Sequence, residues 1–265
     1  MQPFNALTQT RYGSFLYNKN DQIVGRCLEL YGEYSELEVE FLRQLCGPGS
    51  VVADVGANIG AIAVPLAQHA GPTGCVYAFE PERIAFQTLC ANVALNSLAN
   101  VECVHAAVGA SHETLHLPEL RYDLEANFGG VELAAFSTGR PVRQVMLDDY
   151  LELARFTLVK IDVEGMECAV IAGARELLRV QRPLLYIEND RLEKSDDLIA
   201  ALGALEYRSY WHTPPLFNPN NSRGNKQNIF SDTAAFVNML CVPRERPASI
   251  QGFVEARIGE HPFKG

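Results

Sequence analysis

The segment 51–60, VVADVGANIG, constrains the fold of this chain more than any other. Its first half is an apolar run interrupted only by Asp54, which is typical of a strand buried on both faces of a parallel sheet. Gly56 and Gly60 follow, and glycine allows positive φ or close approach of a ligand to the backbone. The apolar density of 59–68 indicates a helix packed on the sheet. The segment therefore predicts a strand, a tight turn and a helix, with a ligand where the strand ends.

A second apolar run, 75–79, ends in Glu80, where a strand-end carboxylate can accept both hydroxyls of a ribose. Dinucleotide sites favour G-x-G-x-x-G, and Asn58 stands here at the second glycine, which disfavours NAD. Asp54 can attract an ammonium group such as that of S-adenosylmethionine. We therefore expect S-adenosylmethionine to bind at Asp54, Gly56, Asn58, Gly60 and Glu80.

Three motifs, VVADVGANIG, VYAFEPE and VKIDVEGMECAVIAG, resemble those of the FkbM family of methyltransferases and occur in the same order. LYGEYSELE upstream and NIF with MLCVPRE downstream extend the resemblance over about residues 28–245. It implies a class I methyltransferase fold, which is a Rossmann-like, doubly wound α/β sheet of seven strands with the last antiparallel. It also implies O-methylation of a hydroxyl on a sugar, polyketide or related metabolite. The resemblance further suggests that Tyr31, Glu33 and Tyr34 fold over the methionine end of the cofactor, where the sequence alone predicts a turn before a helix.

The chain has 265 residues, 48% of them hydrophobic, which suits one large α/β domain with additions. We expect a single domain with an N-terminal cap and helix over 1–46, a core over 47–245 and a tail over 246–265. Its seven cysteines form no C-x-x-C pair, so we expect reduced core thiols. The net charge of −10 opposes binding to nucleic acid. With no signal-like segment and no long apolar run, the sequence predicts a cytoplasmic, soluble protein that acts on a small molecule.

Helical and strand patterns alternate along the core, as they do in a doubly wound sheet. Residues 110–147 interrupt this alternation and leave from a strand end beside the predicted cofactor site. They either cover the active site or are a surface addition. The predicted helices are 35–45, 59–69, 82–96, 165–180 and 195–205, and the predicted strands are 51–55, 75–79, 101–104, 156–161, 183–188, 207–212 and 234–242.

Methyl transfer to an alcohol requires a group that removes the hydroxyl proton, or a metal that acidifies it. Asp162, Glu188 and Asn189 follow the fourth and fifth core strands, where catechol-type O-methyltransferases hold magnesium. Three oxygen ligands suit Mg²⁺, so this ion is one possible cofactor. Asp162 and Glu164 precede a helix and can equally be capping residues.

Without a metal, His212 is the first candidate for the general base, because its ordinary pKa lies near neutrality and it ends a strand. Asp162 and Glu188 are the other candidate catalytic residues. Lys160, inside the apolar run LVKI, is expected to form a structural ion pair with a carboxylate such as Asp162 or Glu188.

Two other functions are compatible with parts of this pattern. An NAD-dependent oxidoreductase would share Glu80 but should carry glycine at position 58. A non-catalytic partner subunit that binds S-adenosylmethionine would keep the donor site and lack an open acceptor pocket.

Overall fold

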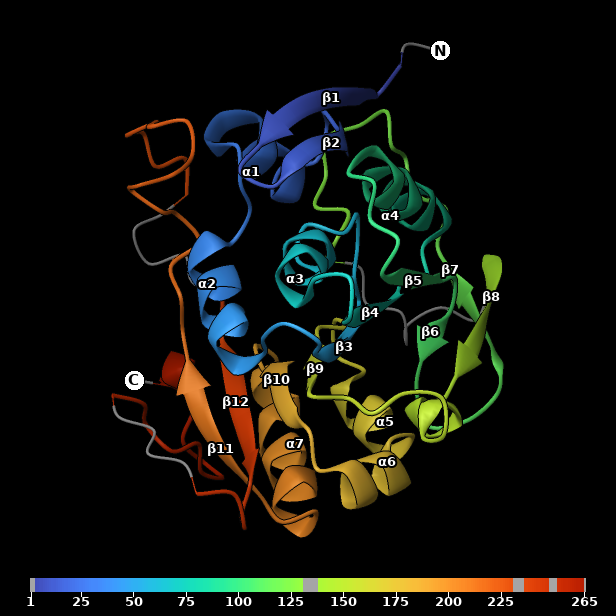
Figure 1. Cartoon of the computed structure of the whole chain (residues 1–265), viewed down its shortest axis with the longest axis vertical. Helices are drawn as coiled ribbons and strands as arrows, with labels where there is room; N and C mark the ends of the chain where they lie inside the picture. The colour runs from blue at the N-terminus through green and yellow to red at the C-terminus, as the bar shows by residue number, and fades with distance from the viewer. Residues whose placement is uncertain (1–2, 131–137, 231–235, 248–251, 265) are drawn as a thin grey trace.

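The computed structural model of the protein describes residues 3–130, 138–230, 236–247 and 252–264. Its centre is a mixed sheet of seven strands in the order β11-β12-β10-β9-β3-β4-β5 (Figure 1). β12 runs antiparallel to both of its neighbours, and the other pairings are parallel. The predicted doubly wound sheet with an antiparallel last strand is thus confirmed. The strands are β3 (Val51–Val55), β4 (Cys75–Phe79), β5 (Val101–Val104), β9 (Leu158–Ile161), β10 (Leu184–Glu188), β11 (Tyr207–His212) and β12 (Asn238–Pro243).

The central strands are apolar on both sides because each face of the sheet has its own layer of helices. In β10, Leu184 and Tyr186 join one core, while Leu185 and Ile187 join the other. Burying one such aliphatic side chain stabilises a fold by roughly 1.5–3 kcal/mol. The first core contains α2 (Glu36–Leu45), α3 (Ala63–Ala70) and α4 (Arg83–Leu95), and the second contains α5 (Glu167–Ala172), α6 (Arg175–Gln181), α7 (Leu192–Ala204) and the short helix η2 (Leu147–Tyr150).

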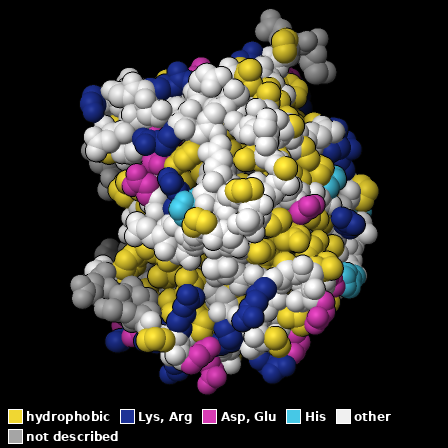
Figure 2. Space-filling model, viewed as in Figure 1, with side chains coloured by type: hydrophobic (Ala, Val, Ile, Leu, Met, Phe, Trp, Pro, Cys, Tyr) yellow, Lys and Arg dark blue, Asp and Glu magenta, His cyan; other side chains and the backbone are white. Residues whose placement is uncertain are grey.

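Each helix in the described ranges is too short or too polar to cross a lipid bilayer. On the face drawn in Figure 2, hydrophobic side chains reach the surface in several places between scattered charged ones.

The N-terminal segment forms an antiparallel hairpin of β1 (Asn5–Thr10) and β2 (Gly13–Asn18). The hairpin rests on α4, where Asn92 and Asn96 bond to the backbone of Leu16 and Ser14. Helix α1 (Val24–Tyr31) follows and was not predicted. Since α1 has 8 residues and lacks a side-chain N-cap, it carries little of the pattern that marks a longer helix.

The insertion contributes to a second small sheet of β6 (Ala107–Val108), β8 (Arg140–Val145) and β7 (Thr114–Leu117). After β7 the chain returns to the N-terminal cap. There the Ala126 N–H donates to Asn20 O, and the Gln22 N–H donates to Ala126 O, both at 3.0 Å. The insertion therefore closes over the same end of the molecule as the cap. Its residues 131–137 lie outside the described part.

The predicted helix 165–180 is two helices, α5 and α6, because the chain turns at Gly173. A Cβ atom at Gly173 would lie 1.9 Å from the carbonyl oxygen of Gly109. The close approach of the segment that follows β6 thus sets the break. The predicted helix 59–69 begins only at Ala63, because residues 56–62 form the turn above β3. The predicted strand 234–242 is described from Asn238 onward, and residues 234–235 lie outside the described ranges.

We predict that Gly173→Ala lowers the free energy of unfolding by about 1–3 kcal/mol, since overpacking against backbone cannot relax by a side-chain rotation. Gly203→Ala is the matched control. It lies exposed in α7 with nothing within 4 Å of an added Cβ, and it should raise the free energy of unfolding by about 0.4–1 kcal/mol. Urea unfolding followed by circular dichroism measures both, and an unchanged midpoint for Gly173→Ala would contradict the packing argument.

Candidate functional site

A large pocket opens at the carboxyl ends of β3, β4, β9 and β10, where open α/β sheets bind ligands. It encloses about 1140 Å³, including the space open to solvent. Its walls come from the strand ends, α1, α2, α4 and the insertion.

Glu80 forms the floor of the pocket at the end of β4. The backbone N–H of Asn58 donates to Glu80 Oε2 at 2.8 Å, and that of Glu82 donates to Oε1 at 2.7 Å. Asn58 has φ of 48°, which turns its N–H toward Glu80. Burial raises the pKa of Glu80 to about 8, against these two hydrogen bonds. Each carboxylate oxygen keeps a further lone pair, so Glu80 can still accept hydrogen bonds from two ligand hydroxyls.

The two glycines of the turn have different neighbours. A Cβ at Gly56 would lie 1.8 Å from the carbonyl oxygen of Asp162, so glycine here lets the loops after β3 and β9 meet at the pocket wall. A Cβ at Gly60 would lie 2.8 Å from Leu89 Cδ1 on α4. Gly60 is outside the pocket lining and packs the turn against α4, and its role as a cofactor ligand stays a prediction.

Asp54 lies behind the pocket rather than in its wall. Its carboxylate is fully buried, and Oδ1 is 3.4 Å from Lys160 Nζ. Lys160 Nζ also donates to Asp162 Oδ2 at 3.1 Å, which confirms the predicted ion pair with Asp162. Burial lowers the pKa of Lys160, but Asp162, Asp54 and Glu38 raise it more, so Lys160 stays charged. Asp54 therefore contacts the pocket wall through Lys160, which does line the pocket.

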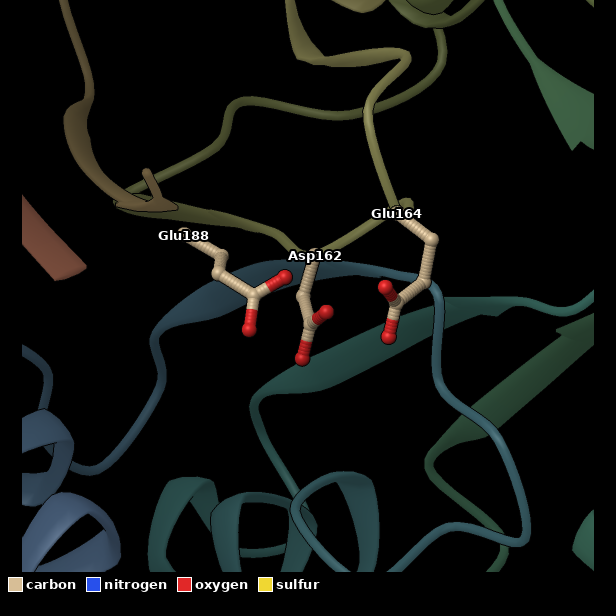
Figure 3. Close-up of side chains that lie close together, drawn as sticks. All are labelled: Asp162, Glu164 and Glu188. Carbon is tan, nitrogen blue, oxygen red and sulfur yellow. The ribbon is translucent and has the colours of Figure 1, made fainter. Parts of the chain in front are cut away.

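Three carboxylates converge at the ends of β9 and β10. One oxygen each of Asp162, Glu164 and Glu188 lies within 4.8 Å of the others, and all three side chains project to the same side of the loop (Figure 3). Arg191 pairs with Glu164. Burial and the charge of Asp162 raise the pKa of Glu164 to about 8. The same two causes raise the pKa of Glu188 well above its ordinary value.

Two of the predicted catalytic or metal-binding residues lie away from this cluster. The Asn189 side-chain amide donates to Ser195 Oγ at 3.0 Å and to Met239 Sδ at 3.3 Å. His212 Nδ1 is 2.8 Å from the Tyr186 hydroxyl, and its ring packs 4.2 Å from that of Phe41.

Neither residue lines the pocket, because Asn189 packs beneath the sheet edge and β10 and β12 separate His212 on β11 from β9. Burial lowers the pKa of His212 to about 4. The roles of Asn189 as a metal ligand and of His212 as the general base therefore stay predictions.

Tyr31 and Glu33 also lie outside the pocket lining. The Tyr31 hydroxyl donates to Gln227 O and accepts from the Ile229 N–H. Glu33 accepts hydrogen bonds from Arg11, Asn218 and the Ser222 backbone, which uses both of its oxygens. These residues connect the segment before α2 to the polar loop 218–229, and their role as cofactor ligands stays a prediction.

Glu38 and Tyr34 also line the pocket. Glu38 was not predicted, and Tyr34 was suggested only by the family resemblance. Glu38 lies one helical turn before Leu42 and so faces the core side of α2. A carboxylate on the apolar face of an amphipathic helix is the signal that could have found it. Burial raises the pKa of Glu38 to about 7.

The insertion forms part of the pocket wall. Of the two alternatives for residues 110–147, a cover over the active site and a surface addition, this position favours the first. Leu117, Pro118 and Leu120 supply apolar surface beside the end of β4, and Asn127 to Gly130 lie opposite the turn after β3. A Cβ at Gly129 would lie 2.8 Å from the Asn58 side chain, so the two loops are in close contact.

Comparison with known proteins agrees with this architecture. The model of the methyltransferase FkbM domain matches residues 54–209. A "Methyltransferase 1" of Beauveria bassiana is 26% identical over 145 residues, which cover 47% of this chain and 58% of that protein. The alignment thus spans little more than half of that relative's length.

Among solved structures, a precorrin-6y C5,15-methyltransferase from Geobacter metallireducens has a TM-score of 0.50 at 15% identity, covering 78% of this chain and 85% of that one. A methyltransferase FkbM from Methylobacillus flagellatus has a TM-score of 0.47 at 18% identity, covering 74% of this chain and 44% of that one. The likeness to the first supports a class I methyltransferase fold. Because the family model matches more than half of the chain, this protein belongs to the methyltransferase FkbM domain family.

Proposed function

We propose that this protein transfers the methyl group of S-adenosylmethionine to a hydroxyl oxygen of a small metabolite, such as a sugar or a polyketide. The observation that carries the proposal is the position of Glu80. It is 7% exposed, lies at the end of β4 and is held by two backbone N–H groups beside the glycine turn. That arrangement leaves a fixed pair of acceptors for the two ribose hydroxyls of a nucleoside.

The acceptor hydroxyl is expected to bind next to the donor. With the nucleoside over β3 and β4, the reactive methyl group would point toward the ends of β9 and β10. There Asp162 has a partly exposed carboxylate that can take a proton from an attacking hydroxyl. The new oxygen–carbon bond forms as the sulfur–carbon bond breaks, S-adenosylhomocysteine leaves, and the hydroxyl proton passes to the carboxylate.

A magnesium ion fits this site poorly. Of its three predicted ligands, Asn189 donates its side-chain N–H group to Ser195 and Met239, and Asp162 pairs with the ammonium group of Lys160 at 3.1 Å. Within the described ranges, Asp162, Glu164 and Glu188 are the carboxylates close enough to share an ion, and the second of them also has a basic partner, Arg191. A divalent cation on Asp162 would meet the like charge of Lys160 at short range. The proposed reaction therefore runs through the carboxylates without a metal step.

We predict that S-adenosylmethionine and S-adenosylhomocysteine bind in calorimetric titrations and that NAD does not. Glu80→Ala should weaken binding of both by at least about tenfold, because hydrogen bonds to a charged group contribute roughly 1.5–3 kcal/mol. Glu102→Ala, which removes an exposed carboxylate from the adjacent strand β5, is the control and should bind normally. Binding of NAD alone would favour the oxidoreductase alternative.

A turnover assay distinguishes an enzyme from a non-catalytic subunit that only binds S-adenosylmethionine. An enzyme should release S-adenosylhomocysteine in the presence of at least one member of a panel of sugars and phenols. Tight donor binding with no turnover across that panel would favour a partner subunit.

We predict that metal removal leaves this protein's ligand binding unchanged. Titration of Mg²⁺ into the complex with S-adenosylhomocysteine should give no saturable heat, and the affinity for S-adenosylhomocysteine should be equal with and without chelator. Saturable Mg²⁺ binding that disappears in Glu188→Gln would restore the metal hypothesis.

The buried carboxylates predict a pH dependence of stability. Glu80 and Glu164 have pKa values of about 8 in the folded protein, against 4.5 for an ordinary glutamate. Between these values the folded state holds protons that the unfolded state has released, so the free energy of unfolding should fall as pH rises through this window.

Thermal unfolding of the ligand-free protein should accordingly show a melting temperature that falls as pH rises from about 4.5 to about 8. Glu164→Gln should flatten this decline, and Glu102→Gln should leave it unchanged. Bound S-adenosylmethionine should favour the ionised form of the pocket carboxylates. The increase in melting temperature that it causes should therefore become larger as pH rises. A melting temperature that rises across the window would contradict the assignment.

A further inference from the structure

The carboxylates of the pocket form two groups on either side of β3. Glu80 and Glu82 lie at the end of β4, while Asp162, Glu164 and Glu188 lie at the ends of β9 and β10. β4 and β9 are the two neighbours of β3 in the sheet. If the donor nucleoside lies over β3 and β4, as in the proposed function on which this inference rests, the second group faces the acceptor.

Acidic side chains outnumber basic ones in the wall of the pocket. Among its described lining residues, Lys160 is the one basic side chain, and it is already paired with Asp54 and Asp162. S-adenosylmethionine brings a sulfonium, an ammonium and a carboxylate, which together add a single positive charge. On the acceptor side, Lys160 pairs with Asp162 and Arg191 pairs with Glu164. The charged groups that act on Glu188 are other carboxylates, so Glu188 is the group that a cation on the acceptor would match. The lining carboxylates are Glu38, Glu80, Glu82, Asp162, Glu164 and Glu188.

Glu188 is a buried carboxyl group in the acceptor side of the pocket wall. Its side chain is 8% exposed, and Oε2 has no hydrogen-bond partner within the described residues. Buried carboxylate oxygens normally accept hydrogen bonds, since leaving one unsatisfied costs about 1–3 kcal/mol or more. Glu188 lines the pocket, and its carboxylate lies on the same side as those of Asp162 and Glu164 (Figure 3). A donor from a bound molecule would satisfy it.

We propose that the acceptor is an amino alcohol, a molecule that carries a protonated amine close to the hydroxyl that is methylated. The ammonium group donates to Glu188 Oε2 and remains protonated throughout. The hydroxyl proton passes to Asp162 as the oxygen–methyl bond forms and the sulfur–methyl bond breaks. Acceptors with a carboxylate or phosphate near the reacting hydroxyl are excluded by the same charges.

Two further features favour an ammonium group over a metal ion. Tyr34 and Phe236 line the pocket and pack edge to face, with ring centroids 6.0 Å apart, and aromatic faces attract organic cations. An ammonium ion also needs hydrogen-bond acceptors rather than a complete coordination shell, so it tolerates Lys160 beside Asp162 better than a divalent ion does. The raised pKa of Glu188 is consistent with a bound cation, because a positive charge beside this carboxyl group would lower its pKa and favour its charged form.

The test uses three ligands of one skeleton, glucosamine, glucose and glucuronate, whose substituents are cationic, neutral and anionic. Each is titrated into the full-length protein saturated with S-adenosylhomocysteine, in chelator, at a pH where the amine is protonated. Glucosamine should bind at least about tenfold more tightly than glucose, the effect of one close charge pair, and glucuronate should bind most weakly.

Glu188→Gln, an isosteric change, should reduce the preference for glucosamine to less than about twofold while keeping its affinity for S-adenosylhomocysteine. Glu164→Gln provides a second variant if Glu188→Gln does not fold, and Glu102→Gln is the exposed control that should keep the full preference. Failure to bind S-adenosylhomocysteine would contradict the proposed function itself. With that ligand bound, equal or undetectable binding of the three sugars, or a preference that survives in both pocket variants, would overturn the amino-alcohol inference alone.

Discussion

The site depends on one buried ion pair between two central strands. Asp54 on β3 and Lys160 on β9 are paired in the sheet register, and Lys160 reaches onward to Asp162 at the pocket wall. Removing one partner of a buried pair costs about 3–5 kcal/mol, because the remaining charge is left uncompensated. A shift of register by one residue would turn Lys160 to the opposite face of the sheet. The pair thus links strand alignment to the position of the acceptor-side carboxylate.

Around this pair, the apolar residues that stabilise the fold and the ionisable residues of the pocket lie in different places. The two helical layers bury the apolar side chains of the sheet, whereas the ionisable groups gather where the strands end. Glu80, Glu164 and Glu188 are held there with raised pKa values, which shows that their environment disfavours the charged forms. Ionising these carboxyl groups is therefore unfavourable in the ligand-free fold, and a bound cation would reduce that electrostatic cost.

The sheet could be predicted from sequence because each central strand is an apolar run and each strand end carries a polar residue. Asp162, Glu188 and Glu80 were found in this way, and they do line the pocket. Asn189 and His212 follow the same rule and lie elsewhere, since position at a strand end does not fix the direction of a side chain. Glu38 was missed because it comes from a helix, and the break at Gly173 depends on a contact with Gly109 that no local pattern encodes.

The charge of the pocket also limits which acceptor chemistry is compatible with the donor. A sulfonium donor becomes neutral at sulfur during transfer, so an environment rich in carboxylates stabilises the reactants more than the product S-adenosylhomocysteine. For the transfer to be fast, the acceptor side must offset this by taking up the hydroxyl proton as the bond forms. Asp162, partly exposed and beside Lys160, is placed to do so. The positive charge lost at sulfur is then matched by the negative charge that Asp162 loses when it takes the proton, and an ammonium group at Glu188 keeps its charge unchanged.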